Sequence, residues 1–160
     1  MHAPESDPSA DLVGTDRCRR ASLRPILSEF VATALLLAVV VGSGIQGERL
    51  AGGNVALALL ANSFATAAGL VALIAAFGPV SGAHMNPAVT MAAACTGSLP
   101  WARVGGYVVA QVAGAFGGVA VAHGMFELPV FSASMHVRSG MSQAFAEFVA
   151  TFALLMVVLA

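Results

Sequence analysis

Ser81-Gly82-Ala83-His84-Met85-Asn86-Pro87-Ala88-Val89-Thr90 is a polar, proline-broken segment inside the stretch 50–102, which contains no Asp, Glu, Lys or Arg. Proline suits the first position of a helix, where its missing N–H would go unpaired anyway, and Asn86 before it is a preferred N-cap. We predict a helix from Pro87 to about Gly97, where a glycine followed by a proline gives a stop signal. Its length is roughly 16 Å, half the hydrocarbon thickness of a bilayer. We therefore expect a half-helix that enters the membrane without crossing it.

Irregular backbone at membrane depth survives only where protein buries it or water lines it. The segment before the half-helix is thus expected to border an aqueous path. The N-terminus of the half-helix brings free N–H groups and about half a positive charge to the midplane, so neutral solutes could hydrogen-bond there while cations are repelled. The expected pore residues are Gly82, Ala83, His84, Met85, Asn86, Pro87 and Ala88.

This ten-residue segment resembles the first Asn-Pro-Ala signature of the major intrinsic protein family, the aquaporins and glycerol facilitators, in its Ser-Gly-Ala-His-x-Asn-Pro-Ala-Val-Thr form. The resemblance is to a bacterial-type member and covers residues 23–160, which would be the N-terminal two-thirds of a usual member. It implies an all-α transmembrane, aquaporin-like bundle. In that hourglass fold two half-helices, one per repeat, meet at mid-membrane.

Composition places the chain in the membrane class, because 58% of its residues are hydrophobic and only 9% are charged. We predict a disordered cytoplasmic tail over 1–24 and a membrane channel domain over 25–160. The N-terminus is expected in the cytoplasm and the protein in the bacterial inner membrane, since basic residues favour the inside. The basic cluster before the first apolar run consists of Arg17, Arg19, Arg20 and Arg24.

Four membrane spans are predicted from apolar length and turn residues. They cover 25–44, 54–77, 102–123 and 141–160. The re-entrant loop and half-helix occupy 79–97, with Pro79 ending the second span. The connection 126–140 is expected outside the cell.

Two polar side chains within the spans are expected to act inside the protein. A carboxylate within a membrane has a high free-energy cost, so we expect Glu29 to face the protein interior and to be a functional candidate. The alternative is that Glu29 lies near the lipid headgroups. Gln111 is expected to bond backbone groups of the re-entrant segment. It lies beside a stripe of small residues that lets two helices pack closely, and the stripe is formed by Gly106, Ala110, Gly114 and Gly118.

A short repeat links the first and fourth spans. Glu29-Phe30-Val31-Ala32-Thr33 reappears as Glu147-Phe148-Val149-Ala150-Thr151. Three spans per repeat is an odd number, so the fourth span would start a second repeat of inverted topology. The two glutamates resemble the pair that braces the two pore loops of the family. The second Asn-Pro-Ala and the arginine after it do not occur in these 160 residues, so we expect an incomplete chain.

The leading functional hypothesis is a passive channel for water or small uncharged solutes such as glycerol and metalloid hydroxides, including arsenous acid. Thr66 precedes Asn86 by twenty residues, at a place where many water-selective members have a bulky aromatic, and so implies a wider opening. The alternatives are a secondary transporter with a broken-helix site and a packing protein without transport.

The expected partners are the lipid bilayer, small neutral solutes and, in the complete protein, three further copies in a homotetramer. We expect no nucleic acid, cofactor or metal, and no catalytic residues or enzyme activity. Cys18 and Cys95 have no paired spacing that would suggest a disulfide.

Overall fold

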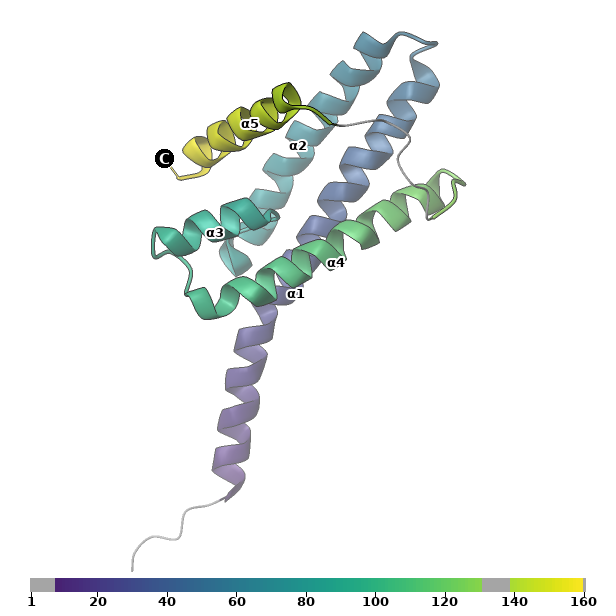
Figure 1. Cartoon of the computed structure of the whole chain (residues 1–160). Helices are drawn as coiled ribbons and strands as arrows, with labels where there is room; N and C mark the ends of the chain where they lie inside the picture. The colour runs from purple at the N-terminus through teal and green to yellow at the C-terminus, as the bar shows by residue number, and fades with distance from the viewer. Residues whose placement is uncertain (1–7, 131–138, 160) are drawn as a thin grey trace, which may run out of the picture.

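The computed structural model describes residues 8–130 and 139–159, and every regular element in these ranges is an α-helix (Figure 1). The helices are α1 (Pro8–Leu50), α2 (Val55–Ser81), α3 (Pro87–Cys95), α4 (Trp101–Met125) and α5 (Met141–Leu159). Four of them contain stretches long and apolar enough to cross a membrane: Leu23–Leu50, Val55–Ser81, Trp101–Met125 and Met141–Val158. The expected all-α, aquaporin-like class is therefore confirmed. Residues 1–7, 131–138 and 160 of the predicted tail, outer connection and fourth span lie outside the described residues.

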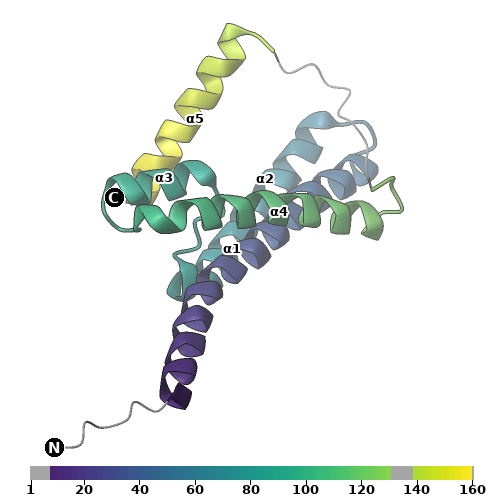
Figure 2. The same cartoon turned by 60° about the horizontal axis from the view of Figure 1, so that its bottom comes forward.

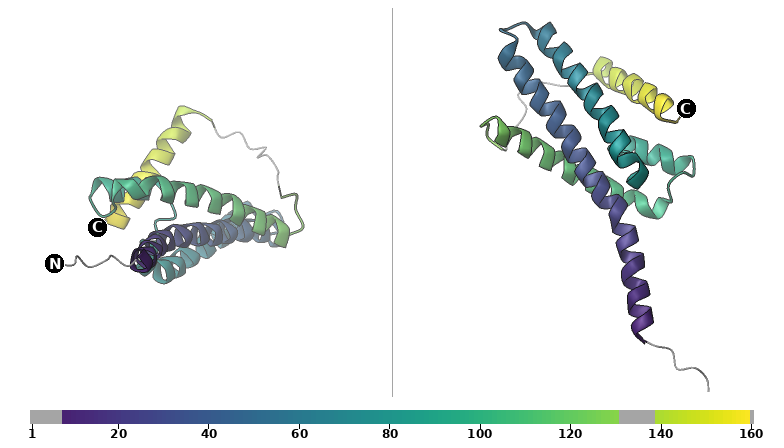
Figure 3. Two further views of the ribbon diagram at one scale, coloured as in Figure 1. Left: turned by 90° about the horizontal axis from the view of Figure 1, so that it is seen from below. Right: turned by 180° about the vertical axis from the view of Figure 1, so that it is seen from behind.

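Helix α1 is the centre of the assembly. It packs against both α2 and α4, and α4 crosses it obliquely, as Figures 2 and 3 show. The short helix α3 packs against the start of α4. Among the described helices, α5 contacts only α3. The α1, α2 and α4 group thus forms a frame that surrounds the loop between α2 and α3.

Close contact between α1 and α4 depends on missing side chains. A Cβ atom at Gly114 would collide with the Phe30 carbonyl oxygen, and one at Gly118 would collide with that of Ala34. Both collisions involve backbone, which cannot move aside without disturbing α1. Glycine at these positions therefore brings the two helix backbones into direct contact.

Three of the predicted boundaries differ from the structure, and one of them is the end of the first span, where α1 continues past residue 44 to Leu50. Helix α1 begins at Pro8, inside the predicted disordered tail 1–24; proline is tolerated in a first turn, and no other proline interrupts the helix before Pro25. Helix α2 passes through Pro79, where we expected it to end, and stops at Ser81. Only one turn remains after this proline, and the left-handed Gly82 closes that turn by donating its N–H to the Gly78 carbonyl at 2.9 Å.

Candidate functional site

The loop between α2 and α3 has an unusual backbone. Gly82, Ala83 and Met85 have φ values of 89°, 48° and 47°. These values lie in the left-handed region, which residues other than glycine rarely adopt. Ala83 and Met85 are nevertheless buried, together with Ala32 of α1. Such a conformation needs support from the surrounding structure.

The side chain of Glu29 on α1 supplies that support. Its Oε1 accepts hydrogen bonds from the Ser81 hydroxyl at 2.6 Å and from the His84 N–H at 3.0 Å. Its Oε2 accepts from the Met85 N–H at 2.8 Å and from Gln111 Nε2 at 2.8 Å. Glu29 is fully buried, so these four donors replace the water that the carboxylate has lost. The structure thus places Glu29 inside the protein, against the loop.

A second group of bonds ties α4 to the start of α3. Gln111 Nε2 also donates to Thr90 Oγ1 at 2.9 Å, and Thr90 donates its own proton to the Asn86 carbonyl at 3.1 Å. The Nδ1 atom of His84 lies 3.2 Å from the same hydroxyl oxygen. Thr90 therefore joins the loop, α3 and α4 in one network.

Four polar residues of this network were not among the predicted site residues: Ser28, Ser81, Thr90 and Tyr107. Ser81 receives a hydrogen bond from Ser28 at 3.1 Å and from the Ala83 N–H at 3.2 Å, while its carbonyl accepts from the Tyr107 hydroxyl at 3.0 Å. The sequence gives one signal: Tyr107 and Gln111 share one face of a helix, four residues apart. Ser81 gives none, because its role depends on contacts with residues far away in the chain.

Asn86 caps α3 as its type predicts. Its φ and ψ of −155° and 127° are extended, and its Oδ1 accepts from the Ala88 N–H at 2.8 Å. Pro87 follows as the first helical residue and is exposed, while Asn86 and Ala88 are half-buried. The Asn86 amide and the first turn of α3 are therefore open to a solute on one side.

The remaining predicted residues lie elsewhere. Thr66 is on α2, away from the loop network, and bonds to Asn62 at 3.2 Å. Glu147 is exposed on α5 and lines a shallow hollow with Ser142 and Gln143. Gly106 packs against Ile26. Gly114 and Gly118 face α1, and Ala110 is also a buried residue of α4. The structure thus brings together the loop, Glu29 and Gln111, but not Thr66 or Glu147. Gln111 donates to the side chains of Glu29 and Thr90, not to the backbone groups that we expected.

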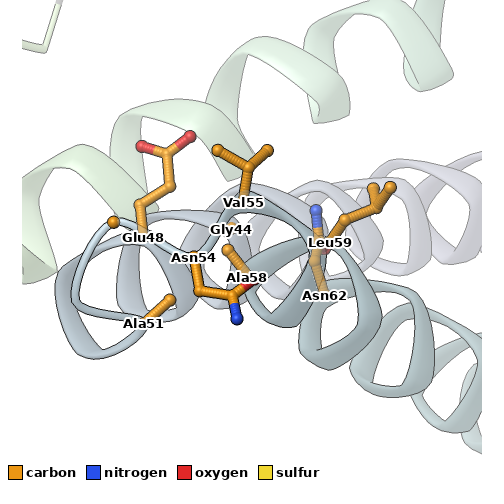
Figure 4. Close-up of a pocket in the computed structure, with 9 residues that line it drawn as sticks. Gly44, Glu48, Ala51, Asn54, Val55, Ala58, Leu59 and Asn62 are labelled. Atoms are coloured by element: carbon orange, nitrogen blue, oxygen red, sulfur yellow. The ribbon is translucent and has the colours of Figure 1, made fainter.

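A separate cavity of about 330 Å³ lies between the end of α1 and the start of α2 (Figure 4). Its walls include Gly44 and Glu48 from α1, the N-cap residue Asn54, and Leu59 and Asn62 from α2. Asn62 is at the end of this cavity closest to Thr66, which follows it by one helical turn.

Comparison with known sequences places these features in a family. The family model described as Major intrinsic protein matches residues 17–160. Aquaglyceroporin AqpS of Rhizobium meliloti is 49% identical over 137 residues, which cover 86% of this chain and 58% of that protein. Probable aquaporin NIP7-1 of Arabidopsis thaliana is 35% identical over 132 residues, covering 81% of this chain and 46% of that protein. Aquaglycerol porin AQY3 of Saccharomyces cerevisiae is 34% identical over 122 residues, 75% of this chain and 19% of that protein. The chain thus spans less than two-thirds of the length of each of these relatives.

Proposed function

Because the chain belongs to the major intrinsic protein family, we propose that it forms the first half of a passive membrane channel for water and small uncharged solutes. The observation that carries this proposal is the loop 82–85, held by the Glu29 carboxylate so that α3 starts beside it. A helix of this length ends about halfway through a bilayer. The capped end of α3 would then lie in the middle of the membrane.

The chemistry of that end favours neutral solutes. The N-terminus of a helix has unpaired N–H groups and carries about half a positive charge. The Asn86 amide adds polar atoms, and the Glu29 oxygens are already occupied by four hydrogen-bond donors, so they are not free to coordinate a passing cation directly. A water molecule or a hydroxyl group could accept from these donors, whereas a cation would be repelled.

The proposed pore also needs an inverted second half. Helix α5 repeats the sequence around Glu29 and leaves Glu147 exposed, which supports a role for Glu147 in bracing a second loop. The Asn-Pro-Ala segment of that half would come from residues beyond those described. We further propose that the N-terminus is cytoplasmic, that the membrane is the bacterial inner membrane and that the complete protein is a homotetramer.

The side chain of Thr66 supports the proposal that solutes larger than water pass through the channel. It is small, and it replaces the bulky aromatic found at this place in many water-selective relatives. The names of two relatives, an aquaglyceroporin and an aquaglycerol porin, also fit this proposal. We propose glycerol and metalloid hydroxides such as arsenous acid as solutes beside water.

Stopped-flow light scattering on liposomes that contain the complete gene product tests this function. Water flux follows a sucrose gradient and glycerol flux a glycerol gradient. Thr66→Phe is expected to reduce glycerol flux more than water flux. The matched control is Ala68→Phe, which adds the same bulk to an exposed position about 200° further round α2.

Equal reductions of both fluxes by Thr66→Phe would contradict the solute assignment. A glycerol flux that requires a proton or sodium gradient would instead indicate a secondary transporter. Wild-type liposomes that are no more permeable than empty liposomes would refute the channel itself.

A further inference from the structure

A small polar cluster on α1 and α2 is separate from the loop network. Asn62 Oδ1 lies 3.2 Å from the Thr66 hydroxyl on the same helix and 2.9 Å from the Ser43 hydroxyl on α1. Ser43 also lies 2.6 Å from the Val39 carbonyl, so its one proton is shared between the two acceptors. The Asn62 oxygen is therefore occupied by hydroxyl groups from both helices.

In the structure the oxygen of the Asn62 amide is the atom that lies beside these two hydroxyl groups. With Oδ1 turned toward Ser43 and Thr66, the NH₂ group is at the inner end of the cavity between α1 and α2, beside Gly44 (Figure 4). A Cβ at Gly44 would lie only 3.4 Å from Asn62 Nδ2, so glycine leaves this space open. Among the described residues, none accepts a hydrogen bond from Nδ2. Two N–H donors are thus presented to the cavity.

The same contacts decide what Thr66 can offer. Its single proton is donated to Asn62, so its oxygen can only accept a further hydrogen bond. Donor and acceptor groups are therefore arranged in sequence along α2, one helical turn apart. A solute with several hydroxyl groups can use both at once, because each hydroxyl both donates and accepts.

We propose that Asn62 is a solute-selecting residue, whose amide N–H groups receive a hydroxyl oxygen of a neutral polyhydroxylated solute before it passes Thr66. This inference rests on the proposed function, because it assumes that Thr66 lines the opening. Asn62 also has a positioning role: it holds the Thr66 hydroxyl as an acceptor. Ser43 stabilises the arrangement from α1.

The test compares glycerol and water flux through the complete gene product with three substitutions. Asn62→Asp keeps an oxygen for Ser43 and Thr66 but removes the N–H donors, and Asn62→Ala removes both. Each is expected to lower the ratio of glycerol to water permeability by about two- to tenfold, the effect of losing one hydrogen bond. Ser63→Ala is the control, because its hydroxyl bonds the Leu59 carbonyl of its own helix at 2.8 Å.

Three results would overturn the inference. One is an unchanged ratio in both Asn62 variants; if Thr66→Phe still lowers glycerol flux, the proposed function survives without this residue. Another is an equal change in Ser63→Ala, which would make the effect unspecific. The last is failure of both Asn62 variants to reach the membrane, measured by immunoblot, since Asn62 would then act in helix association. Loss of the Thr66→Phe effect would refute the proposed function instead.

Discussion

Replacing Glu29 with alanine is expected to release the loop between α2 and α3. The substitution removes the acceptor of the His84 and Met85 N–H groups, which lie at 3.0 and 2.8 Å from the carboxylate oxygens. A buried donor without a partner costs about 1–3 kcal/mol, so two such donors destabilise the closed loop by about 2–6 kcal/mol. Local opening exposes amides to exchange, and at about 1.4 kcal/mol per factor of ten their exchange accelerates by about 30- to 20,000-fold.

Hydrogen–deuterium exchange with mass spectrometry measures this directly on peptides that cover residues 82–90. Glu48→Ala is the matched control, since Glu48 is an exposed glutamate near the end of the same helix. Glu29→Gln should give an intermediate rate, because the amide keeps one acceptor oxygen but turns an NH₂ group toward one pair of donors. Equal exchange in Glu29→Ala and Glu48→Ala would refute the idea that the carboxylate holds the loop.

Three further outcomes are expected. Gly118→Ala is expected to lower the free energy of unfolding by about 1–3 kcal/mol, because the added methyl group collides with α1. Gly105→Ala is the control and should leave this free energy unchanged, because the space around Gly105 is open. Chemical denaturation measures both variants. Arg49→Ala removes a 2.7 Å hydrogen bond to the Phe126 carbonyl and a stacking contact on the Phe126 ring. Backbone amides at the end of α4 are therefore expected to exchange hydrogen about fivefold faster. An unchanged exchange rate would contradict a role for Arg49 in holding that end of α4. A cysteine placed at Ser98 in a cysteine-free protein reacts with impermeant maleimide from the cytoplasmic side; reaction from outside would make the preceding segment a true span.

Local rules predicted α3 well. The cap at Asn86 and the start at Pro87 follow from side-chain and backbone preferences that act within a few residues, and the structure has both. The same kind of rule was wrong at Pro79, because a left-handed glycine three residues later lets α2 finish its last turn. In the structure α1 also starts at Pro8, inside the segment that the sequence predicted as a tail.

The network around Glu29 was only partly predictable. The cost of burying a carboxylate suggested that it faces the interior, but left a position near the headgroups open. Its partners Ser81 and Gln111 are far from it in sequence, at separations of 52 and 82 residues. No periodicity specifies such distances, so these contacts follow only from how α1, α2 and α4 pack.

The left-handed Ala83 and Met85 have a consequence for the order in which the protein assembles. Each costs on the order of 1–3 kcal/mol, so the loop between α2 and α3 does not adopt this shape by itself. Glu29 precedes the loop in the chain, but Gln111, which completes the carboxylate's set of donors, follows it. During synthesis the loop is therefore expected to reach its final conformation only after α4 has been made and has docked on α1. The half-helix α3 is then expected to settle last, after three full spans are already in place.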